Sequence, residues 1–159
     1  MVFNRKGIPM SHIAEVNLLV QDLNALQRAC RRLGLELVRG QQTYRWYGRS
    51  VGDHPLPVGF AKDELGTCEH AIQIPGNDHA YEIGIVTRRD GKPGYVLLWD
   101  FYQGGYGLVD RVGENAERLQ QLYALEVTLG TIEEMNHCVV EQNQLADGSI
   151  ELVLAQQGV

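Results

Sequence analysis

Five apolar residues spaced three and four positions apart constrain the fold more than any other feature of this chain. Such spacing places side chains on one face of a helix, so it predicts one long helix that opens at residues 114–117 and runs for about twenty residues. Glu114 and Glu117 stand in its first turn, where carboxylates favour the positive end of the helix dipole. An apolar face of this length needs a sheet to cover. The five residues are Leu119, Leu122, Leu125, Leu129 and Ile132.

A hairpin is expected directly after this helix. Residues 138–141 and 150–154 have the composition of two short strands. Asp147-Gly148 stands between them and is a strong turn signal, because glycine accepts a positive φ without steric cost. The last part of the chain is therefore predicted to be a helix followed by a two-stranded hairpin.

A strand, a helix and a second strand are expected before residue 50. Residues 12–20 form the first strand, and Asp22 is a natural N-cap for a helix that ends at Gly34. The second strand is predicted at 35–38, with a resumption through 43–47. Three further strands are expected at 68–74, 81–86 and 95–102.

These elements predict an α+β fold, with an antiparallel sheet of about five to seven strands and two helices on one face, ferredoxin-like in style. A single domain is expected over residues 10–157, and residues 1–9 are interpreted as a tail, either native or a tag remnant. Residues 48–67 are predicted to be a long inserted loop, because the periodicity disappears there and glycine and proline recur. Loops of this length are often functional and sometimes merely mobile.

Composition limits the classes of function. The net charge of −6 argues against binding to nucleic-acid phosphates. No apolar run approaches the roughly 18 residues that a membrane span needs, and the N-terminus lacks the apolar core of a signal peptide. Three cysteines are an odd number at scattered positions, which argues against a disulfide framework. A cytoplasmic protein is therefore expected.

Short motifs along much of the chain are similar to those of one known family. They are Met10-Ser11-His12, the helix from Asp22 to Gly34, Tyr81-Glu82-Ile83-Gly84, Trp99-Asp100-Phe101-Tyr102, Tyr123-Ala124 and Asp147-Gly148-Ser149-Ile150. On these motifs the chain resembles the uncharacterised hypothetical-chloroplast-protein family, the thirty-fifth conserved plastid open reading frame. Relatives of that family occur in cyanobacteria, other bacteria and phages.

The resemblance implies a small α+β domain and, in some bacterial settings, a neighbouring ATPase of the AAA type. It implies no catalytic residue. If Met10 marks the start of the family, residues 1–9 are an extension. The loop at residues 48–67 looks like an insertion, so an activity housed there need not belong to the family.

Metal binding is the sharpest chemical hypothesis. Cys68 and His70 lie two residues apart on an expected strand, so their side chains project from the same face. His137 and Cys138 stand where the long helix passes into a strand, and the four side chains together would make a tetrahedral zinc set. The usual Cys-x-x-Cys and His-x3–5-His spacings are absent, which favours a buried cysteine beside partly exposed histidines.

Acid–base chemistry is a second hypothesis. Asp53-His54 and Asp78-His79 both lie in loop or turn contexts, where functional residues concentrate. No nucleophile-elbow motif accompanies them, and turn chemistry alone explains Asn77-Asp78.

A binding surface rich in aromatic residues and arginine is the third hypothesis. Both residue types are the usual anchors of protein interfaces and of stacked bases. The alternative is a strand that alternates core and surface aromatic residues. The candidate residues are Tyr44, Arg45, Trp46, Tyr47 and Arg49, with Trp99, Tyr102 and Tyr106 along the same groove.

The absence of a strong catalytic signature predicts a non-catalytic module, which binds a protein partner or its own copy through a sheet edge, aromatic residues and loop. An AAA-type ATPase is one candidate partner. The alternative is a protein that binds or hydrolyses a nucleotide-like molecule, although Gly104 to Gly107 is not followed by the Lys-Ser/Thr of a phosphate loop. That pocket would contain Arg45, Trp46, His70 and His79. A structural zinc domain is a further alternative, and no other cofactor is expected.

Overall fold

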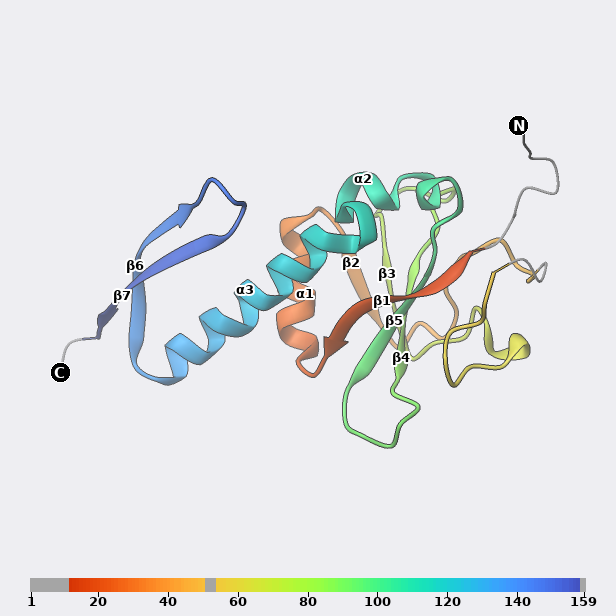
Figure 1. The fold of residues 1–159 in the computed structure, drawn as a ribbon, viewed down its shortest axis with the longest axis horizontal. Helices are drawn as coiled ribbons and strands as arrows, with labels where there is room; N and C mark the ends of the chain where they lie inside the picture. Colours follow the sequence, from red (N-terminus) through yellow and green to blue (C-terminus); the bar gives the residue numbers. More distant parts are fainter. Residues whose placement is uncertain (1–11, 51–53, 158–159) are drawn as a thin grey trace.

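A five-stranded antiparallel sheet is the central layer of the protein, and the computed structural model describes residues 12–50 and 54–157 (Figure 1). Its strand order is β1-β5-β4-β3-β2, and β6 and β7 form a separate two-stranded sheet. The predicted α+β antiparallel architecture is confirmed, whereas the predicted tail at residues 1–9 lies outside the described residues. The strands are β1 (Ile13–Val20), β2 (Glu36–Arg39), β3 (His70–Gln73), β4 (Ile83–Thr87), β5 (Tyr95–Asp100), β6 (His137–Gln144) and β7 (Ile150–Gln156).

Three α-helices accompany the sheet in the described part of the chain. They are α1 (Leu23–Arg32), α2 (Leu108–Val112) and α3 (Glu117–Glu134). The carboxylate of Asp22 accepts a hydrogen bond of 3.0 Å from the Ala25 N–H, which caps α1 as the sequence predicts. The long helix begins later than expected, because Glu114 lies in a separate 3₁₀ turn, η3 (Glu114–Ala116).

The helices cover one face of the sheet, which we call the helix side. Because β1 and β2 are the two edge strands, the β1-α1-β2 connection crosses this whole face. Alternate residues of each strand face this side of the sheet, for example Ile83 and Ile85 of β4. Residues of α1, α2 and the first turns of α3 pack on them. The chief buried residues of this layer are Val16, Val20, Leu26, Cys30, Ile72, Ile83, Ile85, Leu97, Trp99, Leu108, Val112 and Leu119.

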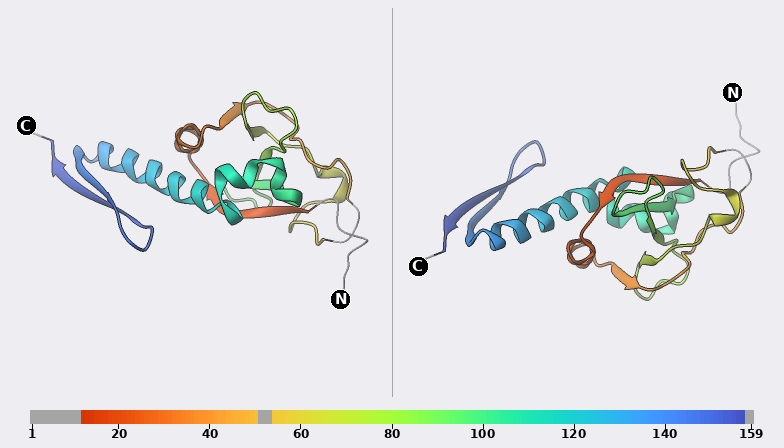
Figure 2. Two further views of the ribbon diagram at one scale, coloured as in Figure 1. Left: turned by 90° about the horizontal axis from the view of Figure 1, so that it is seen from above. Right: turned by 90° about the horizontal axis from the view of Figure 1, so that it is seen from below.

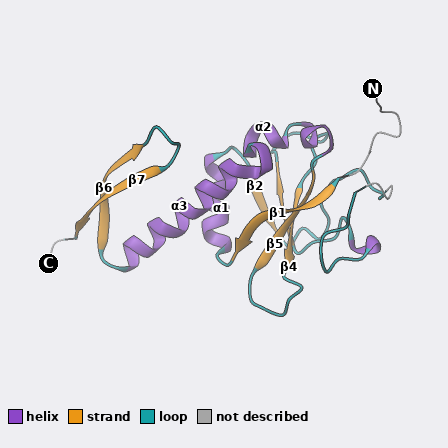
Figure 3. Ribbon diagram, viewed as in Figure 1, coloured by secondary structure: helices purple, strands orange, loops and turns teal. Residues whose placement is uncertain are grey.

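The long loop covers the opposite face of the sheet, which we call the loop side. The described residues of the predicted loop, 48–50 and 54–66, are irregular apart from the short turn η1 (Lys62–Glu64) (Figure 3). The predicted strand resumption at 43–47 is wrong, because a single bridge between Thr43 and Thr67 is all that forms there. The segment closes a second core, made of Ile13, Tyr44, Phe60, Leu65, Cys68, Ala71, Val86 and Leu98.

The end of the chain projects from this body. Helix α3 starts beside α1 and carries the β6–β7 hairpin away from the five-stranded sheet (Figures 1 and 2). The predicted hairpin forms with Gly148 at φ +88°, but it does not join the main sheet. We call residues 125–157, the second half of α3 with the hairpin, the arm.

The element order also differs from the ferredoxin-like β-α-β-β-α-β pattern. Four consecutive strands, β2 to β5, separate α1 from the next helix, where that pattern has two. None of the described helices is both long and apolar enough to cross a bilayer.

Candidate functional site

Three of the predicted surface residues gather at one end of the sheet. The rings of Tyr81 and Tyr106 meet edge to face with centroids 5.0 Å apart. Burial, and then the negative charge of Asp100, raise the pKa of Tyr81 to about 12, and Tyr106, Tyr102 and Tyr47 add to this effect. The backbone N–H groups of Tyr47 and Tyr102 both donate to the Asp100 carboxylate, so the four tyrosines lie near one another. We call them the aromatic end, and the Arg49 guanidinium lies 5.7 Å from the centre of the Tyr47 ring.

A buried carboxylate holds the aromatic end together. Asp100 is fully buried at the end of β5. Its Oδ1 accepts hydrogen bonds from the backbone N–H groups of His12 and Tyr102, each at 3.0 Å. Its Oδ2 accepts a third bond, of 3.1 Å, from the Tyr47 N–H. The Asp100 carboxylate therefore connects three chain segments, at His12, Tyr47 and Tyr102, by hydrogen bonds to their backbone. This is a structural role.

Two histidines extend the aromatic end. The ring of His12 stacks on Phe101 at 4.9 Å and lies 5.5 Å from the ring of His54. His54 also meets Phe101 edge to face at 5.4 Å. Asp53, the predicted partner of His54, lies outside the described residues. The histidine pairing was not expected, because 42 positions separate the two residues and neither stands in a recognisable motif.

The other predicted aromatic residues do not share this surface. Tyr44 is buried in the loop-side core with Trp46 packed against it, whereas Trp99 is buried on the helix side. Arg45 turns inward, where its Nη1 donates to the Ala80 carbonyl at 2.6 Å and its N–H donates to Glu82 at 2.7 Å. The prediction that all eight residues line one groove is therefore wrong, because Tyr44 packs on the loop side of the sheet and Trp99 packs on the helix side.

The four predicted zinc ligands also lie apart. Cys68 lies two residues before β3 and His70 is the first residue of β3, whereas His137 and Cys138 begin β6 on the arm. Strands β3 and β6 belong to separate sheets (Figure 1). No group of three or more potential metal-binding side chains occurs within residues 12–50 and 54–157. Burial raises the pKa of the Cys68 thiol to about 12, and its sulfur donates to the Gln41 carbonyl at 3.2 Å. His70 Nδ1 accepts the Gly40 N–H at 2.9 Å. These two side chains therefore already have structural partners.

The second Asp-His pair forms a turn, as the simpler interpretation predicts. Asn77 Oδ1 accepts hydrogen bonds from the N–H groups of His79 and Ala80, at 2.9 and 3.0 Å. Asp78 and His79 are exposed at its tip. Neither His79 nor Arg45, Trp46 or His70 lines any of the four main cavities of the described structure, so the predicted nucleotide pocket is not formed by these residues.

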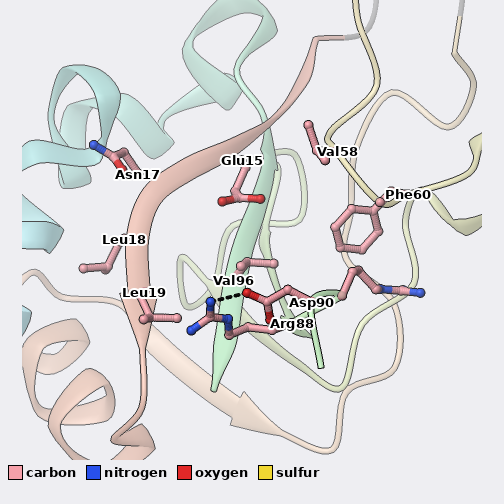
Figure 4. Close-up of a pocket in the computed structure, with 11 residues that line it drawn as sticks. Glu15, Asn17, Leu18, Leu19, Val58, Phe60, Arg88, Asp90 and Val96 are labelled. Atoms are coloured by element: carbon pink, nitrogen blue, oxygen red, sulfur yellow. Dashed lines mark hydrogen bonds and ion pairs between the residues drawn. The ribbon is translucent and has the colours of Figure 1, made fainter. Parts of the chain in front are cut away.

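Two cavities flank β1, which the sequence did not single out. The loop-side cavity, of about 360 Å³, lies between β1, the β4–β5 turn and residues 58–60 (Figure 4). The helix-side cavity, of about 490 Å³, lies between β1, η3 and α3, and Phe101 joins it to the aromatic end. Both have sizes typical of ligand sites, and apolar and polar side chains line both.

The arm presents an apolar surface of its own. Of the nine large apolar side chains exposed in the described structure, five lie on the arm, so this small segment carries most of them. The five are Met135, Val140, Leu145, Val153 and Leu154. A two-stranded hairpin is marginally stable alone, and exposed apolar patches commonly mark interaction sites.

Comparison with known proteins finds one family. Its model, described as a protein of unknown function (DUF1257), matches residues 57–153, from the loop-side core to the second strand of the arm. Searches among curated proteins and among solved structures gave no match. The matched segment is more than half of the 159 residues. The chain therefore belongs to the DUF1257 family.

Proposed function

We propose that this protein is a non-catalytic interaction module that binds a protein partner through its arm. The apolar surface of the hairpin is the observation that carries this proposal. Met135 and Val140 are 61% and 60% exposed, although they lie in the ordered part of the helix–hairpin unit. Side chains of this size are stabilised by about 1.5–3 kcal/mol each when fully buried, so a partner that covers them gains appreciable free energy.

Incomplete packing inside the arm supports the same role. A cavity of about 280 Å³ lies between α3 and the hairpin. Leu125 on the helix and Ile150 and Leu152 on β7 line its apolar part. This cavity is open to solvent, so the apolar side chains that line it lack packing contacts on that side. An apolar side chain from a partner would fill the gap between helix and hairpin.

The charge of the arm indicates the chemistry of the partner. No lysine or arginine occurs after Arg118, whereas five acidic residues lie on the exposed part of the arm. Charge complementarity therefore favours a partner that surrounds an apolar patch with basic groups. An ATPase of the AAA type is the partner class that the resemblance to the plastid family implies. The five acidic residues are Glu133, Glu134, Glu141, Asp147 and Glu151.

Site-specific photo-crosslinking tests the proposal. The photoreactive amino acid p-benzoylphenylalanine replaces Val140 or Val153 on the arm, and Asp78 on the body serves as the control. Asp78 is exposed at the tip of a turn and lines neither cavity beside β1, so adducts there report random encounters. After irradiation in the native cell, mass spectrometry identifies each adduct.

Adducts at Val140 and Val153 with one basic protein, or with a second copy of the chain, support the proposal if Asp78 does not form them. Equal adducts at all three positions, or none on the arm, overturn it. Addition of excess unmodified protein should compete away a specific adduct, whereas a random adduct would persist.

A further inference from the structure

Strand β1 ends the sheet on one side. It pairs only with β5, and no described strand lies beyond it. The two views in Figure 2 place it along the outside of the body. An edge strand presents a row of backbone N–H and C=O groups that another extended chain can pair with. Regular pairing with β5 covers Ile13 to Val16, and the register shifts before Val20.

Successive side chains of β1 point to opposite faces of the sheet. Ile13 belongs to the loop-side core and Val16 to the helix-side core. Leu19 borders the loop-side cavity, as Figure 4 shows, and Ala14 and Val16 border the helix-side cavity. Glu15 and Asn17 border both cavities. A strand added at this edge would send alternate side chains towards one cavity and then towards the other.

Each cavity has apolar side chains in its lining. On the loop side they include Leu19, Phe60 and Val96. On the helix side they include Val16, Trp99, Phe101 and Val109. Apolar side chains of an added strand would therefore be buried on either face, which provides the side-chain selectivity that strand addition requires.

The charges around the cavities favour a basic ligand. The two arginines of the loop-side cavity are already engaged, because Arg88 pairs with Asp90 and Arg89 Nη1 lies 2.7 Å from Glu64 Oε2. The side chains of Glu15 and Glu114 make no ion pair with any described residue. The carboxylates available to a ligand therefore outnumber the available cations.

We propose that the edge of β1 binds an extended segment of a partner polypeptide by strand addition, with apolar side chains in the two cavities and basic side chains beside Glu15 and Glu114. This surface is separate from the arm, so the inference goes beyond the proposed function and does not depend on it. Backbone hydrogen bonds to β1 provide the affinity, and the cavities and carboxylates select the sequence.

Peptide binding tests the proposal directly. The probe is a fluorescein-labelled eight-residue peptide, Lys-Val-Lys-Leu-Thr-Val-Lys-Thr, measured by fluorescence anisotropy with the full chain. The control peptide has the same sequence with N-methyl groups on alternate residues, which removes the N–H donors of one edge while the side chains and charge remain. We expect the probe to bind and the N-methylated peptide to bind at least about tenfold more weakly.

Charge variants locate the site. The double variant Glu15→Lys/Glu114→Lys should weaken binding about tenfold. The matched control is Glu133→Lys/Glu134→Lys, which makes the same change of charge on the arm and should leave binding unchanged. Circular dichroism confirms that each variant is folded before it is titrated. Equal weakening by both double variants means a nonspecific attraction to an acidic protein and overturns the proposal.

Hydrogen exchange reports the pairing itself. In the presence of the probe, amides of residues 13–16 should exchange more slowly, whereas those of β6 should not change. Binding without this protection would mean that the peptide lies on a face of the sheet, which overturns strand addition. Protection of residues 13–16 that rises with protein concentration and is unaffected by the peptide would assign the edge to a second copy and likewise overturn the proposal.

Discussion

Gly84 in the middle of β4 allows the loop to lie on the sheet. A Cβ at this position would overlap the ring atoms of Tyr44, which packs directly on the glycine. Tyr44 is 2% exposed and belongs to the loop-side core with Val86 and Leu98. The absence of a side chain at one residue therefore decides how closely a segment forty positions earlier approaches the sheet.

Two glycine substitutions should change stability in opposite directions. Gly84→Ala forces the Tyr44 ring away and should lower the free energy of unfolding by about 3 kcal/mol, the upper end of overpacking effects. Gly130→Ala in α3 meets no atom within 4 Å and should raise it by about 1 kcal/mol, because alanine favours the helix. Urea unfolding followed by circular dichroism measures both changes. If Gly84→Ala is neutral, the close packing of Tyr44 on β4 is incorrect.

The three cysteines should differ in reactivity. Burial raises the pKa values of Cys30 and Cys68 to about 12, so neither forms a thiolate near neutral pH. Cys138 on the arm is half-buried and free. A thiol reagent such as Ellman's reagent at pH 8 should therefore modify Cys138 rapidly in the native protein and all three in urea. Cys138→Ser should abolish the rapid phase, and a rapid phase that persists would place a second thiol at the surface.

Helices α1 and α3 are joined through buried polar contacts. Glu126 is 6% exposed, and its carboxylate accepts hydrogen bonds from Arg28 at 3.0 Å and Arg32 at 2.7 Å. The Tyr123 hydroxyl accepts the backbone N–H groups of Gln21 and Asp22, at 3.0 and 3.2 Å. The middle of α3 is therefore held to α1, from the residues before the first turn of α1 to its last residue.

Acid should weaken the contact between these two helices. Burial acts to raise the pKa of Glu126, but hydrogen bonds from Arg32 and Arg28 outweigh it, so the pKa lies below its ordinary value of 4.5. The resulting stability is present above about pH 4.5 and is lost as pH falls through the lowered pKa. Glu126→Gln should cost about 1–3 kcal/mol at pH 7 and less at pH 3.

Denaturant unfolding at several pH values measures this difference. Glu133→Gln on the exposed side of the same helix is the control, and it should change stability by less than about 0.5 kcal/mol. A cost of Glu126→Gln that is equal at pH 7 and pH 3 would mean that packing, and not charge, holds the two helices.

Local signals predicted the elements well. Asp22 caps α1 and Gly148 turns the hairpin, because both act through neighbouring backbone groups that the sequence places beside them. The resumed strand at 43–47 was wrong because Glu82 accepts the Arg45 N–H and so competes with a regular strand ladder. The sequence does contain a sign that both faces of the sheet are covered. Tyr95 to Trp99 is a continuous apolar run, without the alternation of apolar and polar residues that is typical of a half-exposed strand.

The candidate site was harder to predict than the elements. Tyr47, Tyr102 and Tyr106 do come near one another, but Tyr44 and Trp99 are core residues on opposite faces. Aromatic residues serve both roles, and composition alone does not separate them. The zinc hypothesis failed for a different reason. It required the hairpin to return to the main sheet, and a long helix places the hairpin elsewhere.

At the scale of the whole molecule, the body and the arm should differ in local stability. The body buries apolar side chains on both faces of its sheet, whereas the hairpin has exposed residues on both strands. Amides of β6 and β7 should therefore exchange with solvent faster than those of β4 and β5. Hydrogen-exchange mass spectrometry on the isolated protein measures this difference, and a bound partner should reduce it. If the amides of β6 and β7 were as well protected as those of β4 and β5 in the isolated protein, the arm would not be less stable than the body.

The attachment of α3 at one end makes it a lever. Eighteen residues of helix span about 27 Å, and the contacts of Tyr123 and Glu126 with α1 lie in its first ten residues. The helix beyond Glu126 is about 12 Å long, so a rotation of about 10° at that fulcrum would move its far end by about 2 Å. A small rearrangement where α1 begins would therefore be magnified at the hairpin, and the position of the hairpin would report on the state of the body.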